Sequence, residues 1–323
     1  MSHTITILDL GTMGNDIPLP DFARYGELVT YHNTQPHEVI ERIKDSTVVL
    51  TNKVAITAEM IAAAPHLAMI GTIATGYNLV DADAAKKRNI PVCNVPNYST
   101  ASVAQHAFAL ILALASRIAE LSEAVKAGEW AQSEFFCFWK NPVVELEGKT
   151  LGIVGFGNIG QAVAALGHNF GMKVLVYTPR PKPAPGYEPF AFASLDELFT
   201  QSDVVSLHCP LTAETDGMVN AARLKTMKKT AFIINCSRGT LINIPDLVLA
   251  LQNNIIAGAG LDVIPVEPMT VNDILHTAPN CIITPHSAWA SEEARTRLIQ
   301  TVFDNVKACI EGKPQNVVNG VII

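Results

Sequence analysis

Residues 151–160 read Leu-Gly-Ile-Val-Gly155-Phe-Gly157-Asn-Ile-Gly160, an apolar run followed by glycines at the spacing G-x-G-x-x-G. A helical pattern follows, and a second apolar strand pattern begins at Lys173. At this spacing the first glycine allows a tight turn, the second admits a pyrophosphate to the backbone, and the third lets the helix pack against the strand. The context predicts a dinucleotide-binding turn. The residues expected to bind the dinucleotide are Gly155, Phe156, Gly157, Asn158, Ile159 and Gly160.

The bulk composition limits the class of protein. A chain of 323 residues exceeds one ordinary core, so two domains are expected. With 49% hydrophobic and only 16% charged residues, the chain suits an α/β protein whose strands are buried on both faces. The net charge of −7, without any basic block, argues against nucleic acid and against an anionic membrane as partners.

Targeting and redox signals predict a cytoplasmic protein. The N-terminus lacks the basic region and the long apolar stretch of a signal peptide. The longest apolar segment, residues 107–115, is too short to span a bilayer. The six cysteines are scattered, with no C-x-x-C pair. We expect reduced core residues rather than a disulfide framework or a zinc site, and therefore no metal.

Strand and helix patterns alternate along the chain, which is typical of βαβ units. Because the dinucleotide unit starts mid-chain, it must follow or interrupt another domain, and the final helical pattern, residues 291–311, could return to that domain. Two such crossovers would form a cleft, where ligands are expected. The predicted fold class is α/β, with two Rossmann-like, doubly wound parallel-sheet domains and the active site in the cleft between them. The strand patterns outside the glycine unit are 5–8, 27–31, 47–50, 68–72, 91–94, 204–208, 231–235, 257–261 and 281–284.

One long helix is predicted over residues 102–127, with Ser99 or Thr100 as its N-cap and Gly128 as its stop. The aromatic cluster Phe135–Trp139 follows it. Three interpretations of this cluster stay open: a loop packed on its own domain, a subunit contact, or a lid over the substrate. Exposure bears on the choice, because large exposed apolar patches mark interaction surfaces.

Three segments place a polar side chain just past a predicted strand, at the edge where open α/β sheets bind ligands. They contribute Arg238, Glu267 and His286. An arginine can clamp a 2-oxo carboxylate with two hydrogen bonds, and a histidine can protonate the developing alkoxide. A glutamate beside the histidine would favour imidazolium. Each residue has a structural explanation when taken singly, but their common placement favours a catalytic set.

The chain resembles the D-2-hydroxyacid dehydrogenase family nearly end to end. Within the family it is most similar to the group of glycerate dehydrogenases and hydroxypyruvate/glyoxylate reductases. The family resemblance rests on residues 155–160, 208–212, 235–239, 258–263, 267–268 and 285–286, and the group resemblance on residues 74–81, 286–289 and 313–318.

The resemblance implies roles for residues of the site. Its catalytic triad is Arg238, Glu267 and His286, with Arg238 also binding the substrate. Backbone N–H groups of the loop at residues 74–76 would hold the substrate carboxylate. The residues of that loop are Ala74, Thr75 and Gly76.

The resemblance also implies cofactor contacts, a partner and domain limits. Asp262 would bind the nicotinamide carboxamide, while Pro210, Cys236 and His286 would line the cofactor. The helix over residues 102–127 would lie in a homodimer interface. The implied domains are residues 1–101 plus 288–323 for the substrate and residues 102–287 for the dinucleotide.

This sequence departs from the pattern of NAD-specific sites at the residues expected to bind the cofactor's ribose. NAD-specific sites carry an acidic residue about 20 residues past the glycines. Here the second strand ends Tyr177-Thr178-Pro179-Arg180, without a carboxylate. A 2′-phosphate would meet no repulsion there, and Arg180 could pair with it. NADP is therefore the favoured cofactor, with Thr178 and Arg180 beside the ribose, and NAD stays open.

The sequence leaves several function classes in view. The favoured one is an oxidoreductase that reduces a small 2-oxo acid, hydroxypyruvate or glyoxylate, to the D-2-hydroxy acid with NAD(P)H. The related C-terminal-binding-protein corepressors use this fold as dinucleotide sensors without needing catalysis, and other relatives dehydrogenate other small acids. The compact ends, without a peptide-binding extension, favour the enzyme.

Overall fold

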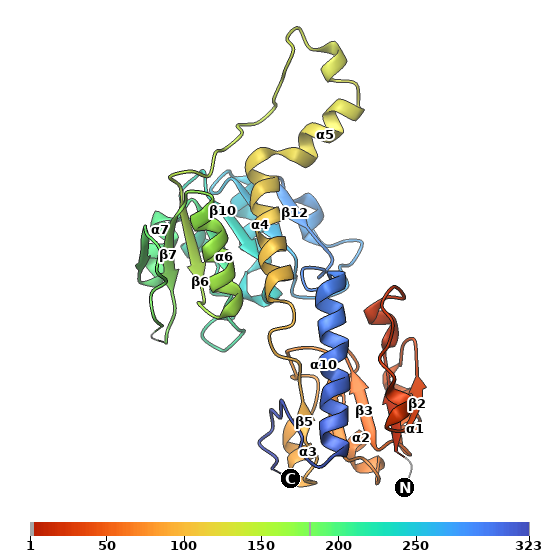
Figure 1. Cartoon of the computed structure of the whole chain (residues 1–323). Helices are drawn as coiled ribbons and strands as arrows, with labels where there is room; N and C mark the ends of the chain where they lie inside the picture. Colours follow the sequence, from red (N-terminus) through yellow and green to blue (C-terminus); the bar gives the residue numbers. More distant parts are fainter. Residues whose placement is uncertain (1–2, 181, 323) are drawn as a thin grey trace. The chain divides into compact units, whose positions relative to one another are not determined.

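The computed structural model describes residues 3–180 and 182–322, which divide into two compact units (Figure 1). The first unit holds the chain up to Ser99 together with the segment from Ala290 onward, and the second unit runs from Thr100 to Trp289. Each unit is built on one sheet of parallel strands connected by helices. The predicted fold class of two doubly wound parallel-sheet domains is confirmed.

The sheet of the first unit has the strand order β2-β1-β3-β4-β5. Every residue of β3 and β4 is buried, as expected for central strands of a parallel sheet. The predicted final helix is confirmed as α10, which Ser291 caps by accepting from the N–H of Ala294. The strands are β1 (Thr4–Ile7), β2 (Glu27–Thr30), β3 (Val48–Thr51), β4 (Met69–Thr72) and β5 (Val92–Cys93). The helices are α1 (Val39–Ile43), α2 (Ala58–Ala63), α3 (Ala82–Lys87) and α10 (Glu292–Ile310).

The sheet of the second unit has the strand order β12-β11-β10-β9-β6-β7-β8. The chain runs outward from β6 to β7 and β8 and then returns to β9 on the other side of β6. Ligands bind at such a reversal, outside the carboxyl ends of the strands. The strands are β6 (Thr150–Val154), β7 (Lys173–Tyr177), β8 (Phe190–Phe192), β9 (Val204–Leu207), β10 (Phe232–Asn235), β11 (Gly258–Leu261) and β12 (Cys281–Ile283). The helices are α4 (Thr100–Ser116), α5 (Ile118–Lys126), α6 (Asn158–Asn169), α7 (Leu195–Gln201), α8 (Ala221–Leu224) and α9 (Ile244–Gln252).

The predicted strands are confirmed with ends that differ by at most one residue. The sequence analysis missed β8, the edge strand of the second sheet. This strand has only three residues, two of them exposed, so it lacks the apolar run that marks a buried strand.

The prediction of one helix over residues 102–127 is wrong, because the helix breaks at Arg117. That residue has φ +54°, in the left-handed region that ends helices. Up to Ser116, α4 packs its apolar face against α6 and the sheet. The next helix, α5, has only Ala124 buried, so no core holds it in line with α4.

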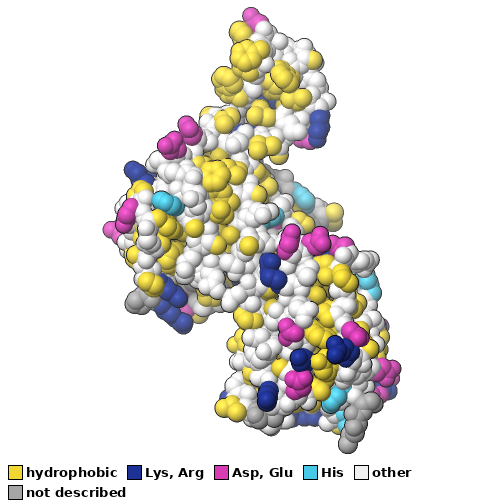
Figure 2. Space-filling model, in the orientation of Figure 1, with side chains coloured by type: hydrophobic (Ala, Val, Ile, Leu, Met, Phe, Trp, Pro, Cys, Tyr) yellow, Lys and Arg dark blue, Asp and Glu magenta, His cyan; other side chains and the backbone are white. Residues whose placement is uncertain are grey.

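Residues 118–143, which we call the arm, project from the rest of the second unit beyond this break (Figure 1). The backbone N–H of Val144 donates to the carbonyl O of Ala115 at 2.9 Å, so the arm departs and returns at one point. Phe136 is 90% exposed, and Phe135 and Trp139 are more than half exposed. Figure 2 shows hydrophobic side chains gathered on the arm. Phe135, Phe136 and Trp139 are therefore not packed on their own domain.

Candidate active site

The turn between β6 and α6 contains two glycines that close packing requires and one that packing does not require. Gly155 has φ +95°, and a Cβ there would lie 2.7 Å from the backbone N of Cys209. A Cβ at Gly160 would overlap the carbonyl O of Gly155. A Cβ at Gly157 would meet nothing within 4 Å beyond its chain neighbours in the described residues, so packing does not explain this glycine. The space beside Gly157, at the N-cap of α6 with no acidic side chain in the first turn, fits a pyrophosphate.

Gly157→Ala should weaken NAD(P)H binding by about 10-fold or more, since the new methyl group would enter the pyrophosphate space. Its free energy of unfolding should stay close to that of the wild type. The matched control is Gly160→Ala, which should lower the free energy of unfolding by about 1–3 kcal/mol because the methyl group overpacks the turn. Fluorescence titration with NAD(P)H and urea unfolding separate the two effects. Wild-type affinity in Gly157→Ala would mean that the pyrophosphate binds elsewhere.

The loop after β7 carries the two residues predicted to lie beside the ribose. Thr178 Oγ1 donates to the carbonyl O of Arg180 at 3.2 Å, and the Arg180 side chain is exposed. No aspartate or glutamate occurs between Tyr177 and Tyr187. The loop therefore offers a cation and a hydroxyl, and no carboxylate.

Arg238 follows β10 and is presented by a firmly held turn. Asn235, fully buried at the end of β10, donates through Nδ2 to the carbonyl O of Arg238 at 2.8 Å and accepts the N–H of Ser237 at 3.0 Å. Ser237 Oγ donates to the carbonyl O of Cys209 at 2.6 Å. The Arg238 side chain is exposed, with Nη1 donating to the carbonyl O of Ser237. The guanidinium can therefore meet a ligand at this edge of the sheet.

His286 and Glu267 form a hydrogen-bonded pair. His286 Nδ1 lies 2.6 Å from Glu267 Oε2, and Glu267 Oε1 accepts the backbone N–H of Ile264 at 3.2 Å. A carboxylate can only accept, so Nδ1 carries the proton and Nε2 is the atom left for a substrate. The ring keeps 30% of its side-chain surface exposed. A second histidine of this edge, His208, is unsuited to the same task because desolvation lowers its pKa to about 4.

The three predicted catalytic residues share one sheet edge. Arg238 follows β10, Glu267 follows β11 and His286 follows β12, and these strands are neighbours. The structure joins His286 to Glu267 directly. Among the described residues, Arg238 makes no ion pair with either of them.

Asp262 holds the turn that carries His286. Its side chain is buried, and its carboxylate accepts the N–H groups of Ser287 and Ala288, each at 2.9 Å. The N–H of His286 donates to the carbonyl O of Asp262 at 2.8 Å and to that of Thr284 at 2.9 Å. Among the described residues, Oδ1 accepts from Ser287 and from Thr284 Oγ1, while Oδ2 accepts only from Ala288. Each carboxylate oxygen has two lone pairs, so Oδ2 can still accept a carboxamide N–H.

The other predicted cofactor residues flank this edge. Pro210 follows β9, is exposed, and accepts a hydrogen bond from Thr215 Oγ1 through its carbonyl O. Cys236 follows β10 and is half-buried, and burial together with the charge of Asp262 raises the pKa of its thiol. The thiol is therefore neutral at pH 7 and offers an apolar contact rather than a nucleophile.

In the first unit, the predicted substrate loop follows β4. The carbonyl O of Ala74 accepts the N–H of Val95 at 2.9 Å, and the carbonyl O of Thr75 accepts Asn94 Nδ2 at 2.7 Å. In contrast, the N–H groups of residues 74–76 have no acceptor within the described part of the chain. A loop in which the carbonyl groups of Ala74 and Thr75 are engaged, and whose N–H groups have no acceptor among the described residues, is suited to an anion.

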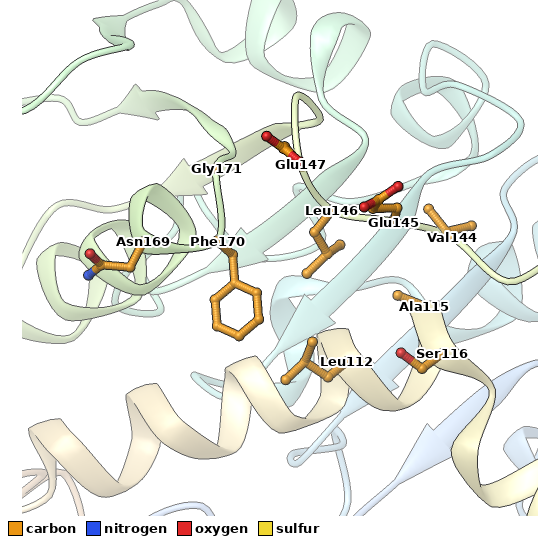
Figure 3. A pocket seen from close by; sticks show the side chains of 10 residues that line it. All are labelled: Leu112, Ala115, Ser116, Val144, Glu145, Leu146, Glu147, Asn169, Phe170 and Gly171. Carbon is orange, nitrogen blue, oxygen red and sulfur yellow. The ribbon is translucent and has the colours of Figure 1, made fainter.

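A separate pocket of about 540 Å³ lies at the opposite end of the second sheet (Figure 3). It is formed by the end of α4, the residues before β6 and the turn after α6, where Leu112, Leu146 and Phe170 make its apolar wall. Because β6 and β7 begin there, this pocket is not at the carboxyl edge that carries Arg238 and His286.

No group of three or more His, Cys, Asp or Glu side chains in residues 3–180 and 182–322 is placed to hold a metal ion. Over the same ranges, none of the helices combines the length and the apolar character needed to cross a membrane.

Sequence reasoning missed Asn235, which holds the turn of Arg238, and His106, whose Nε2 lies 2.9 Å from Thr284 Oγ1. Asn235 ends an apolar strand, and His106 lies on the predicted long helix among alanines and leucines. The available signal was a polar residue in an otherwise apolar, buried pattern, because such a residue needs a hydrogen-bond partner.

Comparison with known proteins identifies the family. The model described as "D-isomer specific 2-hydroxyacid dehydrogenase, NAD binding domain" matches residues 108–288. The chain is 44% identical to the hydroxypyruvate reductase of Blautia hydrogenotrophica, over 94% of this chain and 95% of that protein. It is 38% identical to the glycerate dehydrogenase of Methylorubrum extorquens, over 98% and 99% of the two chains.

A solved structure supports the same conclusion. It is that of the NADPH-dependent glyoxylate/hydroxypyruvate reductase of Sinorhizobium meliloti, in complex with NADP and malonate. The similarity has a TM-score of 0.85 at 28% identity and covers all of this chain and 98% of that one. The predicted NAD(P)-dependent dehydrogenase is confirmed. The chain belongs to the D-isomer specific 2-hydroxyacid dehydrogenase family.

Proposed function

We propose that this dehydrogenase reduces hydroxypyruvate or glyoxylate to the D-2-hydroxy acid, with His286 as the acid and base. The observation that carries the proposal is the 2.6 Å contact between His286 Nδ1 and Glu267 Oε2, which leaves Nε2 to meet the substrate. The hydroxypyruvate reductase and the glyoxylate/hydroxypyruvate reductase described above support this substrate class.

The roles of the residues follow from their chemistry. When bound, the reduced nicotinamide supplies a hydride to the substrate carbonyl carbon. The Arg238 guanidinium clamps the carboxylate and polarises the carbonyl group. His286 donates the proton on Nε2 to the oxygen as its negative charge develops. Glu267 stabilises the imidazolium that makes this donation and fixes the orientation of the ring.

The substrate carboxylate is proposed to bind at Ala74, Thr75 and Gly76. The N–H groups of this loop supply several donors to one anion, and the bonds made by its carbonyl groups hold the loop in place. We accordingly propose residues 1–101 plus 288–323 as the substrate domain and residues 102–287 as the dinucleotide domain.

The dinucleotide is proposed to bind along the carboxyl edge of the second sheet. The glycine turn would hold the pyrophosphate, Pro210 and Cys236 would contact the nicotinamide, and Asp262 would bind its carboxamide. The remaining turn residues that would contact the dinucleotide are Phe156, Asn158 and Ile159. The loop after β7, with Thr178 and Arg180, would hold the ribose. This arrangement is supported by the space at Gly157 and by the match of the NAD binding domain model.

We expect NADPH to give a higher kcat/KM than NADH, because the loop after β7 offers Arg180 and no acid. Arg180→Ala should shrink this preference by about 1.5–3 kcal/mol, the range for a hydrogen bond to a charged group. Thr178→Asp should move the preference toward NADH, since a carboxylate repels the 2′-phosphate and accepts from the 2′-hydroxyl. Steady-state kinetics with both cofactors measures these changes. A wild-type enzyme that prefers NADH by about tenfold, or 1.4 kcal/mol, would contradict the assignment.

The enzyme is further proposed to be a cytoplasmic homodimer. The exposed aromatic side chains of the arm, with α4 beside it, support a contact with a second copy. The six cysteines are all free, which supports a reducing compartment.

A panel of 2-oxo acids, assayed with NADPH and with NADH, tests the proposed function. Hydroxypyruvate and glyoxylate should give the highest kcat/KM of the panel. A higher value for a bulky 2-oxo acid would reject the substrate class. NAD(P)H binding without reduction of any member would instead support a dinucleotide sensor.

A further inference from the structure

Thr284 lies between a buried carboxylate and a histidine of another element. Its Oγ1 is 2.6 Å from Asp262 Oδ1 and 2.9 Å from His106 Nε2. Asp262 follows β11, Thr284 follows β12, and His106 lies in the second turn of α4. The Asp262 side chain is 1% exposed and the His106 side chain 24%. The family match and the sequence patterns assign no role to His106 or Thr284.

The proton positions in this chain of contacts follow from the chemistry of the groups. A hydroxyl has one proton to donate, and a carboxylate can only accept. The 2.6 Å contact is therefore a donation from Thr284 to Asp262, and such bonds to a charged acceptor are short. The Thr284 oxygen must then accept from His106, so His106 Nε2 carries a proton. The hydrogen bonds run from His106 through Thr284 to Asp262, and His106 Nε2 also lies 3.4 Å from Asp262 Oδ1.

The same carboxylate holds the backbone around His286. It accepts the N–H groups of Ser287 and Ala288, while the carbonyl groups of Asp262 and Thr284 both accept the N–H of His286. His286 has φ +51°, a left-handed conformation that is unfavourable for a residue with a side chain. This conformation persists only where its surroundings hold it in place.

Helix α4 is tied to the turn at a second point. Ser102 Oγ donates to the carbonyl O of Ala288 at 2.6 Å. Ser102 and His106 are four residues apart, so they lie on one face of the helix. The first turns of α4 therefore clamp the turn of residues 284–288 at both ends, next to the ring that Glu267 orients.

We infer that His106 and Thr284 are positioning residues for His286. They act through Asp262, by keeping its carboxylate aligned with the N–H groups of the turn, and they touch neither substrate nor cofactor. The inference rests on the proposed function, since it assumes that His286 transfers the proton. A displacement of the ring by about 1 Å can cost about 100-fold in rate, so loss of this alignment should affect kcat.

Thr284→Val removes the hydroxyl at nearly constant shape, and Thr284→Ser keeps it. His106→Leu removes the donor, and His106→Gln keeps an N–H in reach. With hydroxypyruvate, Thr284→Val and His106→Leu should each lower kcat by about 10- to 100-fold. Their KM for hydroxypyruvate should stay within about twofold of wild type. Thr284→Ser and His106→Gln should restore most of kcat, which a merely structural role would not predict.

The double variant His106→Leu/Thr284→Val tests whether the two residues form one chain. Residues of one hydrogen-bond network are not additive, so its kcat should match that of Thr284→Val within about threefold. A fully multiplicative loss would overturn the inference, as would wild-type kcat in both single variants. If Thr284→Val does not fold, the comparison of kcat between His106→Leu and His106→Gln tests the inference. If His106→Leu does not fold, the comparison between Thr284→Val and Thr284→Ser tests it.

His286→Ala separates this inference from the proposed function. If His286→Ala loses activity while His106→Leu and Thr284→Val retain wild-type kcat, only the positioning role fails. If His286→Ala retains wild-type kcat, the proposed proton transfer itself fails, and the positioning role falls with it.

Discussion

Replacing His286 with alanine should lower kcat for the reduction of hydroxypyruvate or glyoxylate by about 10²–10⁴-fold, the usual contribution of a positioned proton donor. The affinity for NAD(P)H should change little, because the loss falls on proton transfer. Steady-state kinetics, with a fluorescence titration of the cofactor, measures the change in kcat and the affinity for the cofactor.

His276→Ala is the matched control for this variant. His276 is an exposed residue of the second unit whose ring contacts the carbonyl O of Thr270. Its replacement removes the same side chain without touching the catalytic edge, so kcat should stay at the wild-type value. A His286→Ala enzyme with wild-type kcat would remove His286 from the reaction.

Arg238→Lys should lower kcat/KM by about 10²-fold or more, because an ammonium cannot replace the planar guanidinium that binds a carboxylate with two parallel hydrogen bonds. KM should rise as well, since the carboxylate is held in the ground state too. The control is Arg223→Lys, at a residue that pairs with Asp196 and takes no part in the proposed site. Unchanged kinetics in Arg238→Lys would make Arg238 a bystander.

The strands and the glycine turn could be predicted because their signals are local. Buried parallel strands appear as short apolar runs, and the turn needs glycines at fixed positions. The break at Arg117 could not be predicted, because the residues on both sides favour a helix. What ends α4 is the loss of a packing surface, and that depends on where the sheet stops. The edge strand β8 lacked a signal for a similar reason, since two of its three residues are exposed.

For the candidate site, the sequence could place side chains at the ends of strands but could not predict which of them are in contact. The contact of His286 with Glu267 depends on the path of two loops that differ in length, and no spacing rule gives it. The link from His106 to Thr284 spans 178 residues. Such a contact follows from the packing of α4 on the sheet, which no local pattern encodes. The catalytic and cofactor roles of the site residues stay predictions until the variants are measured.

The arm is a segment of the chain whose two ends lie close together. Its two ends meet at the hydrogen bond between Val144 and Ala115, and its tip is closed by a bond from Trp130 Nε1 to the carbonyl O of Phe136. Adding or removing residues in a surface loop with adjoining ends costs little, because loop-closure entropy grows slowly with length. Evolution or protein engineering can therefore lengthen, shorten or replace the arm while the strands that carry Arg238 and His286 keep their register. The proposed subunit contact and the proposed chemistry can therefore change separately in this chain.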